Sequence, residues 1–265
     1  MSAITTIGAF FLAWLLVWIP IAIPLAILLK WRPFTPLAPS QKLPLLASLY
    51  AIVPLLLWGF AALQQQPFEQ YGLRWQGSLF ISGLGGMAIA LLGLTLLFSL
   101  QQWQGWSHWQ IAAIKPLGIA ILPSFLIGLW VSGTEELVFR GFVLNQLLFG
   151  LPWWGAAIVS SVIFALLHLV WEQQETIPQL PGLWLMGMVL VLARWADDGI
   201  LGLAIGLHGG WVGGMISLDS VQFIEYGDRA PTWFTGIGNK PLAGLGGILL
   251  MALTGGVVYG IGNFN

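Results

Sequence analysis

Residues 116–149 read PLGIAILPSFLIGLWVSGTEELVFRGFVLNQLLF, and this stretch decides the fold. A helix needs about 20 mainly apolar residues to cross the hydrocarbon core of a bilayer, and residues 116–149 exceed that length. Its charged residues are Glu135, Glu136 and Arg140, which lie within six residues of one another. The stretch is long enough for one tilted helix, or for two helical segments broken near Gly133.

The composition of the whole chain indicates a membrane protein. Of its 265 residues, 58% are hydrophobic and 7% are charged, whereas about 25% are charged in an average soluble domain. So few charged side chains cannot cover a protein surface in water, and lipid is the natural solvent for such a surface. The net charge of −1 offers no basic surface for nucleic acid, and the absence of cysteine excludes disulfides and thiolate sites.

Seven further apolar stretches accompany the first one. The sequence therefore predicts an all-α, polytopic, multi-pass integral membrane protein that forms a bundle of about eight transmembrane helices with no sheet. The N-terminal stretch, at about 4–29, is expected to be a retained helix, since it is too long for a signal peptide. A single membrane domain over 1–265 is expected, with predicted spans at about 4–29, 44–63, 78–100, 116–149, 154–171, 181–195, 198–218 and 241–262.

The polar connections carry most of the charged residues. Six basic residues lie in odd-numbered connections and two, Arg74 and Arg194, in even-numbered ones, which by the positive-inside bias predicts cytoplasmic odd connections and both termini outside. Asp197 and Asp198 are interpreted as solvated loop charges. The longest connection, 219–240, is too short to fold alone and is expected to be an ordinary surface loop or to lie over one face of the bundle.

The seventh and eighth predicted helices are rich in glycine. Small residues let helix backbones approach closely in lipid, where hydrophobicity does not drive helices together. Close packing explains these glycines without a further role.

Three charges inside the fourth stretch require a physical reason, because a charge near the middle of the bilayer costs about 2.5–3.5 kcal/mol. On a helix Glu136 and Arg140 are i,i+4 neighbours and can form an ion pair. Glu135 is rotated by about 100° from Glu136 around the helix axis. It therefore has no charge partner when Glu136 pairs with Arg140. An unpaired buried carboxylate suits general-base chemistry.

Two histidines also lie inside predicted spans. His168 belongs to the fifth and His208 to the seventh, each among apolar residues. Ionisable groups in a membrane face the bundle interior and find partners there. We therefore expect helices 4, 5 and 7 to bring Glu135, His168 and His208 together, although a lone histidine in such a place is commonly a hydrogen-bonded packing residue. His108, among tryptophans of an interfacial stretch, is given no role.

These pieces resemble the CPBP family of membrane proteases, which contains type II CAAX prenyl endopeptidases and bacteriocin-processing enzymes. The shared motifs are EExxxR at Glu135–Arg140, FxxxH at Phe164–His168 and a later histidine, His208, in a helix of small residues. Their order and helical context match too. The family-like catalytic core is expected at 116–218.

The resemblance implies an eight-helix bundle with a cavity open to lipid and solvent. It implies that Glu135 activates a water molecule, that Glu136 and Arg140 brace it, and that His168 and His208 orient water and stabilise developing charge. Many members also carry Asn four residues after the last histidine, as an oxyanion donor. Here Val212 occupies that position, and losing one such donor costs about 2.7–4 kcal/mol of barrier. The Trp211 N–H is one possible substitute.

A metal-independent reaction is expected, with no cofactor. The contiguous HExxH zinc motif is absent from the chain. The alternative is a Zn²⁺ held by the two histidines and one glutamate, but a glutamate used as a ligand is not free to act as the base.

Three functions remain open from the sequence. The first is an intramembrane endopeptidase that cuts a membrane-associated protein or peptide, including a lipidated one, with the bilayer and that substrate as partners. The second is a non-catalytic scaffold or immunity-type protein that keeps the same buried network, which Val212 favours. The third is a proton-coupled carrier, for which the hydropathy shows no inverted repeat. The surplus carboxylate of Glu135 favours the enzyme.

Overall fold

The fold is a bundle of membrane-spanning helices, seen in a computed structural model that describes residues 2–32, 35, 37–170 and 173–264. Within this part, seven helical stretches are long and apolar enough to cross a membrane. They confirm an all-α, multi-pass integral membrane protein. Their bounds are Ala3–Leu28, Ser40–Leu63, Gly77–Trp103, Ile111–Leu148, Trp153–Val170, Gln173–Ala196 and Leu245–Asn263.

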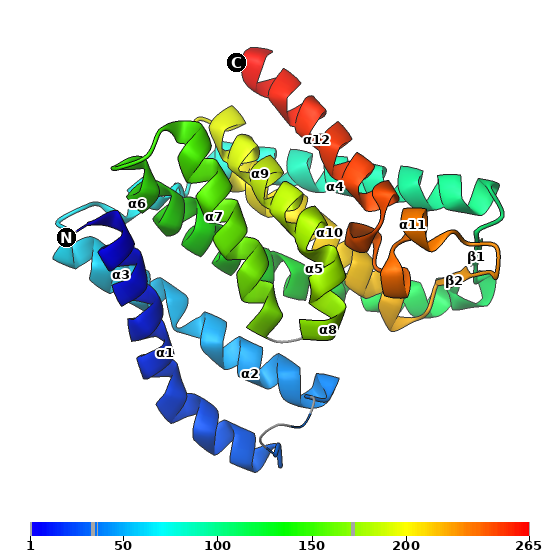
Figure 1. Ribbon diagram of the computed structural model, residues 1–265, viewed down its shortest axis with the longest axis horizontal. Helices are drawn as coiled ribbons and strands as arrows, with labels where there is room; N and C mark the ends of the chain where they lie inside the picture. The colour runs from blue at the N-terminus through cyan, green and yellow to red at the C-terminus, as the bar shows by residue number, and fades with distance from the viewer. Residues whose placement is uncertain (1, 33–34, 36, 171–172, 265) are drawn as a thin grey trace.

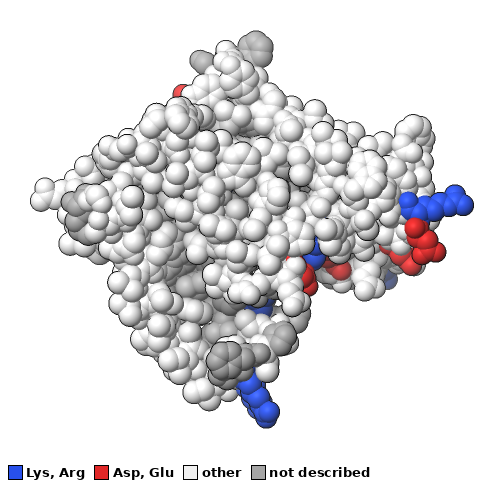
Figure 2. All heavy atoms as spheres, viewed as in Figure 1, with Lys and Arg blue, Asp and Glu red and all other residues white. Residues whose placement is uncertain are grey.

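The surface of the bundle agrees with burial in lipid. In the view of Figure 2, most of the visible face carries no charged residue, and the coloured atoms gather toward its lower and right-hand margins. Large apolar side chains such as Leu28, Leu92 and Ile119 are mostly exposed. The helices are α1 (Ala3–Leu28), α2 (Pro39–Ala51), α3 (Val53–Leu63), α4 (Gly77–Trp103), α5 (Ile114–Glu136), α6 (Leu144–Leu148), α7 (Trp153–Leu167), α8 (Gln173–Thr176), α9 (Leu180–Ala196), α10 (Gly202–Ser220), α11 (Thr232–Thr235) and α12 (Leu245–Phe264).

The seventh predicted span, 198–218, is α10, which lies in the middle of the bundle (Figure 1). It packs against α4, α5 and α9, and most of its residues are buried. Because α10 contacts protein and not lipid, it does not need an apolar surface and can hold glycines and a histidine. This explains why α10 falls outside the seven apolar stretches.

The fourth stretch is one long helix that does not break at Gly133. It stays α-helical to Glu136 and then widens into a π-helix, η3 (Leu137–Val143), before α6. Two side chains donate hydrogen bonds to carbonyls of the widened turns: Ser160 Oγ to Phe139 O at 3.1 Å, and the Arg194 guanidinium to Arg140 O. π-helical turns are rare and frequently lie at functional sites, and this one directly follows Glu135 and Glu136.

The expectation of no sheet is wrong in one small detail. β1 (Ser107–Trp109) pairs antiparallel with β2 (Ile224–Tyr226), so that Ser107 lies opposite Tyr226. The two strands join the connection after α4 to the long connection after α10, which also contains α11. Residues 219–240 are therefore tied by backbone hydrogen bonds to one end of the bundle (Figure 1).

Glycines allow α10 to lie directly against α4. A Cβ placed on Gly206 would lie 1.9 Å from the carbonyl oxygen of Gly83, a backbone atom that cannot turn aside. The close packing predicted for α10 is thus confirmed. In α12 it holds only in part, since a Cβ on Gly256 would meet nothing within 4 Å.

We expect Gly206→Ala to destabilise the protein, because the added methyl forces α10 away from α4. Overpacking of this kind costs about 1–3 kcal/mol. Gly256→Ala is the matched control on another membrane helix and should leave the melting temperature unchanged or raised. Melting curves in the same detergent measure both, and equal melting temperatures for the two variants would contradict the packing of α10 on α4.

Candidate active site

Glu136 and Arg140 form the buried centre of the site. Both side chains have no exposed surface, and Arg140 Nη1 lies 2.9 Å from Glu136 Oε1. The guanidinium also donates from Nη2 to the carbonyl of Gly187 in α9 at 3.1 Å, and its Cζ lies 4.4 Å from the centre of the Phe164 ring. The ion pair expected from the i,i+4 spacing is therefore present, and it links α5 to α7 and α9.

His208 contacts both glutamates. Its Nδ1 lies 2.7 Å from Glu136 Oε1, and its Nε2 lies 3.7 Å from Glu135 Oε2. Only 2% of the residue is exposed, because α10 is enclosed by α4, α5 and α9. Side chains that the sequence singles out, Glu135 and Glu136 on α5 and His208 on α10, therefore meet in the structure.

Glu135 has a partner that the sequence analysis missed. The Tyr50 hydroxyl, on α2, donates a hydrogen bond to Glu135 Oε1, so Glu135 is not left over as expected. Its other oxygen, Oε2, accepts no hydrogen bond from the described residues. A tyrosine inside an apolar span has a hydroxyl that needs a partner, and that was the available signal.

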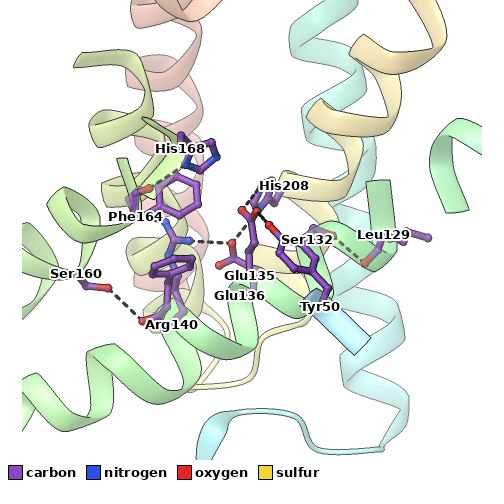
Figure 3. Close-up of polar contacts among 12 residues, drawn as sticks. Tyr50, Leu129, Ser132, Glu135, Glu136, Arg140, Ser160, Phe164, His168 and His208 are labelled. Carbon is purple, nitrogen blue, oxygen red and sulfur yellow. Dashed lines mark hydrogen bonds and ion pairs between the residues drawn. The ribbon is translucent and has the colours of Figure 1, made fainter. Parts of the chain in front are cut away.

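The five side chains form one continuous network (Figure 3). It runs from the Tyr50 hydroxyl through Glu135, His208 and Glu136 to Arg140. Arg140 balances the charge of Glu136. Among the described residues of the network, the carboxylate without a cationic partner of its own is Glu135, which lies at the Tyr50 end. The arrangement holds a carboxylate and an imidazole next to each other inside the membrane bundle.

His168 lies one aromatic ring away from this network. Its Nδ1 is 2.8 Å from the carbonyl of Phe164, one turn earlier in the chain, and it makes no ion pair with a described carboxylate. The Phe164 ring contacts both imidazoles, at 4.7 Å from His168 and 5.9 Å from His208. Of the three residues expected to converge, Glu135 and His208 therefore meet, whereas His168 stands across Phe164.

A cavity of about 650 Å³ adjoins the tyrosine end of the network. Its lining is almost wholly apolar and includes Tyr50, Trp130, Thr134 and Leu137. Trp75 and Phe80, which also line it, are 77% and 57% exposed, so the cavity opens at the outer surface of the bundle. A larger cavity of about 950 Å³ is bordered by residues of the 219–240 connection, and none of its lining residues belongs to the network.

The geometry gives little support to the zinc alternative. Among the described residues no three His, Cys, Asp or Glu side chains are placed to hold a metal ion together. Glu135 and His208 approach each other, but His168 bonds to a backbone carbonyl in place of joining them. A metal-independent reaction stays a prediction, to be tested with a chelator.

The position that related enzymes fill with Asn offers no donor here. Val212 is half-buried on α10, one turn after His208. Trp211 is 5% exposed, and its indole Nε1 makes no hydrogen bond with the described residues. Trp211 does not line the 650 Å³ cavity, so its N–H is not placed beside the Tyr50 end of the network.

Two residues assigned to connections have structural roles. Arg194 lies in the last turn of α9, buried, and donates to Asn145 Oδ1 at 2.8 Å as well as to Arg140 O. Asp197 is half-buried, where burial raises the pKa of its carboxyl, and it accepts a hydrogen bond from Leu203 N at 2.9 Å in the first turn of α10. Neither is a solvated loop charge, whereas Asp198 is exposed as expected.

Comparison with known proteins gives one match. Residues 117–213 match the family described as type II CAAX prenyl endopeptidase Rce1-like. The chain matches no curated protein and no solved structure. The matched residues contain Glu135, Glu136, Arg140, His168 and His208, in agreement with the resemblance carried by the three motifs. Residues 117–213 of this integral membrane protein are therefore similar to the type II CAAX prenyl endopeptidase Rce1-like family.

Proposed function

We propose that the protein is an intramembrane endopeptidase in which Glu135 activates water to cleave a peptide bond of a membrane-associated protein or peptide. One observation carries the proposal: a buried carboxylate lies beside an imidazole and accepts a hydrogen bond from Tyr50, which lines an apolar cavity that opens at the surface of the bundle. A catalytic base must lie within hydrogen-bond reach of its proton, and Glu135 Oε2 accepts no hydrogen bond from the described residues.

The two glutamates have different roles in this mechanism, because they have different partners. Glu136 is held by Arg140 and by His208 Nδ1, so it positions the network. Glu135 takes the proton of the attacking water, the hydroxide adds to the scissile carbonyl, and the proton passes to the leaving amine as the C–N bond breaks. His208 Nε2, which faces Glu135, orients the water. The proposed role of His168 is to stabilise developing charge from the other side of the Phe164 ring, although it does not meet Glu135 and His208 as predicted.

The character of the cavity supports the proposed substrate class. An apolar opening at membrane depth receives an apolar chain, such as a transmembrane segment or a lipid attached to a peptide, more readily than a soluble peptide. The test is cleavage by purified protein in liposomes of peptides ending in a CAAX motif, with and without an isoprenyl group, and of short transmembrane peptides. In water enriched in ¹⁸O the new carboxylate should carry the label. If no peptide in either class is cut, the proposal falls.

The scaffold or immunity-type role is the second candidate. Val212 favours it, because the residue offers no hydrogen-bond donor where many related enzymes have one. In that role the network from Tyr50 to Arg140 only holds α2, α5 and α10 together. An intact, stable protein that cleaves none of the peptides would support this role.

We expect chelators to leave cleavage unchanged, because Glu135 polarises water as a base without a Lewis acid. Dialysis against EDTA and phenanthroline, followed by the liposome assay, measures this effect. A zinc protease treated in parallel serves as the control and should lose its activity. Loss of cleavage that returns on addition of Zn²⁺ would contradict the metal-independent mechanism and favour the zinc alternative.

A further inference from the structure

Hydrolysis of a peptide bond needs a hydrogen-bond donor for the carbonyl oxygen, which becomes an oxyanion when water adds. In the network Arg140 donates from Nη1 to Glu136 and from Nη2 to the carbonyl of Gly187, and His208 Nδ1 faces Glu136. Neither Arg140 nor His208 lines the 650 Å³ cavity. Val212 offers no donor. A donor on the wall of this cavity must therefore come from another element that reaches the Glu135 end of the network.

Hydroxyl groups on the wall of the 650 Å³ cavity come from two of its described residues, Tyr50 and Thr134. Thr134 Oγ1 donates to the carbonyl of Trp130 within its own helix, at 2.9 Å. The Tyr50 hydroxyl instead lies at Glu135. Tyr50 thus lines the space that a substrate would enter and touches the carboxylate that would activate water.

Packing fixes the direction of this phenol. The Tyr50 ring lies 6.3 Å from the ring of Trp14 on α1 and 6.2 Å, edge to face, from that of Trp130 on α5. The residue is 8% exposed. A ring that packs against two indoles keeps its hydroxyl at Glu135, and such preorganised donors stabilise a developing oxyanion at little further cost.

We propose that Tyr50 is a catalytic residue whose O–H stabilises the oxyanion, a role that rests on the proposed function. With substrate bound, the hydroxyl turns from Glu135 Oε1 to the scissile carbonyl oxygen, which frees the carboxylate to accept the proton of water. As the C–O bond to water forms, the carbonyl electrons move onto the oxygen that Tyr50 holds. When the C–N bond breaks they return, and Glu135 passes its proton to the amine nitrogen. Water and the peptide are the only reactants.

The test compares Tyr50→Phe with Tyr71→Phe. Tyr71 is also a fully buried tyrosine, but it belongs neither to the network nor to the lining of the cavity. Removing one oxyanion donor lowers kcat about 10²–10³-fold. Tyr50→Phe should therefore lose that much kcat with little change in KM, and Tyr71→Phe should match the wild type. Melting curves should show both variants folded.

A rescue separates catalysis from packing. Val212 lies one helical turn after His208, so Val212→Asn adds a donor on the same helix. It should restore part of the kcat lost in Tyr50→Phe and should raise the kcat of the wild type by a smaller factor. This difference would not arise if Tyr50 had a purely structural role. Unchanged or increased kcat in Tyr50→Phe, with the wild type active and Glu135→Gln inactive, would overturn the role of Tyr50 alone. Failure of the wild type to cleave any peptide would overturn both proposals.

Discussion

Glu135→Gln should abolish proteolysis while leaving the fold intact. Gln keeps the length and shape of the side chain, and its amide oxygen can still accept the Tyr50 hydrogen bond, but it cannot take a proton from water. General-base help contributes about 10²–10⁴-fold to a rate, so cleavage in the liposome assay should fall by at least the lower figure. The melting temperature should stay close to that of the wild type.

Glu175→Gln is the matched control for this experiment. Glu175 makes an ion pair with Lys240 at 3.5 Å, and both side chains are largely exposed, at 59% and 41%. Exposed pairs contribute about 0–1 kcal/mol, so this variant should keep full activity and stability. If Glu135→Gln cleaves as fast as Glu175→Gln, Glu135 is not the base.

Glu136→Gln should differ from Glu135→Gln by a large loss of stability. It removes the charge partner of Arg140, whose side chain has no exposed surface. Removing one member of a buried ion pair costs about 3–5 kcal/mol, because the other charge remains buried without compensation. His208 loses the carboxylate at its Nδ1 as well. A marked fall in melting temperature is therefore expected, together with lost cleavage.

The double variant Glu136→Gln with Arg140→Met tests the reason for that loss. Without the guanidinium no unpaired charge remains, so the double variant should melt well above Glu136→Gln alone. It should still be inactive, because the hydrogen bonds that position His208 are weakened. A double variant less stable than the single one would show that Arg140 contributes through Gly187 and Phe164 more than through its charge pair.

Helical spacing allowed the Glu136–Arg140 pair to be predicted, since both residues belong to one continuous helix and need no tertiary information. The meeting of His208 with the glutamates followed from the scarcity of ionisable groups in the membrane. The same reasoning wrongly predicted that His168 also meets Glu135 and His208. At the end of α7 its Nδ1 finds the carbonyl of Phe164 one turn back, a local partner that satisfies the ring without a carboxylate.

Features that depend on tertiary packing were beyond the sequence. Tyr50 precedes Glu135 by 85 residues, and its approach depends on how α2 lies against α5. The strands β1 and β2 have three residues each, too few for a periodic pattern. Hydropathy found α10 as one of eight spans but did not place it at the centre of the bundle, because apolar content alone does not distinguish a helix surrounded by lipid from one surrounded by protein.

The position of Tyr50 on α2 has a consequence for the modular organisation of the protein. The family-matched domain starts at residue 117, yet a hydroxyl that touches its carboxylate comes from residue 50. A fragment that starts at the domain boundary would keep every motif residue but lose this hydroxyl and one wall of the cavity. The N-terminal helices thus complete the site: a different helical hairpin joined to the same domain would present another side chain to Glu135 and change the shape of the cavity opening.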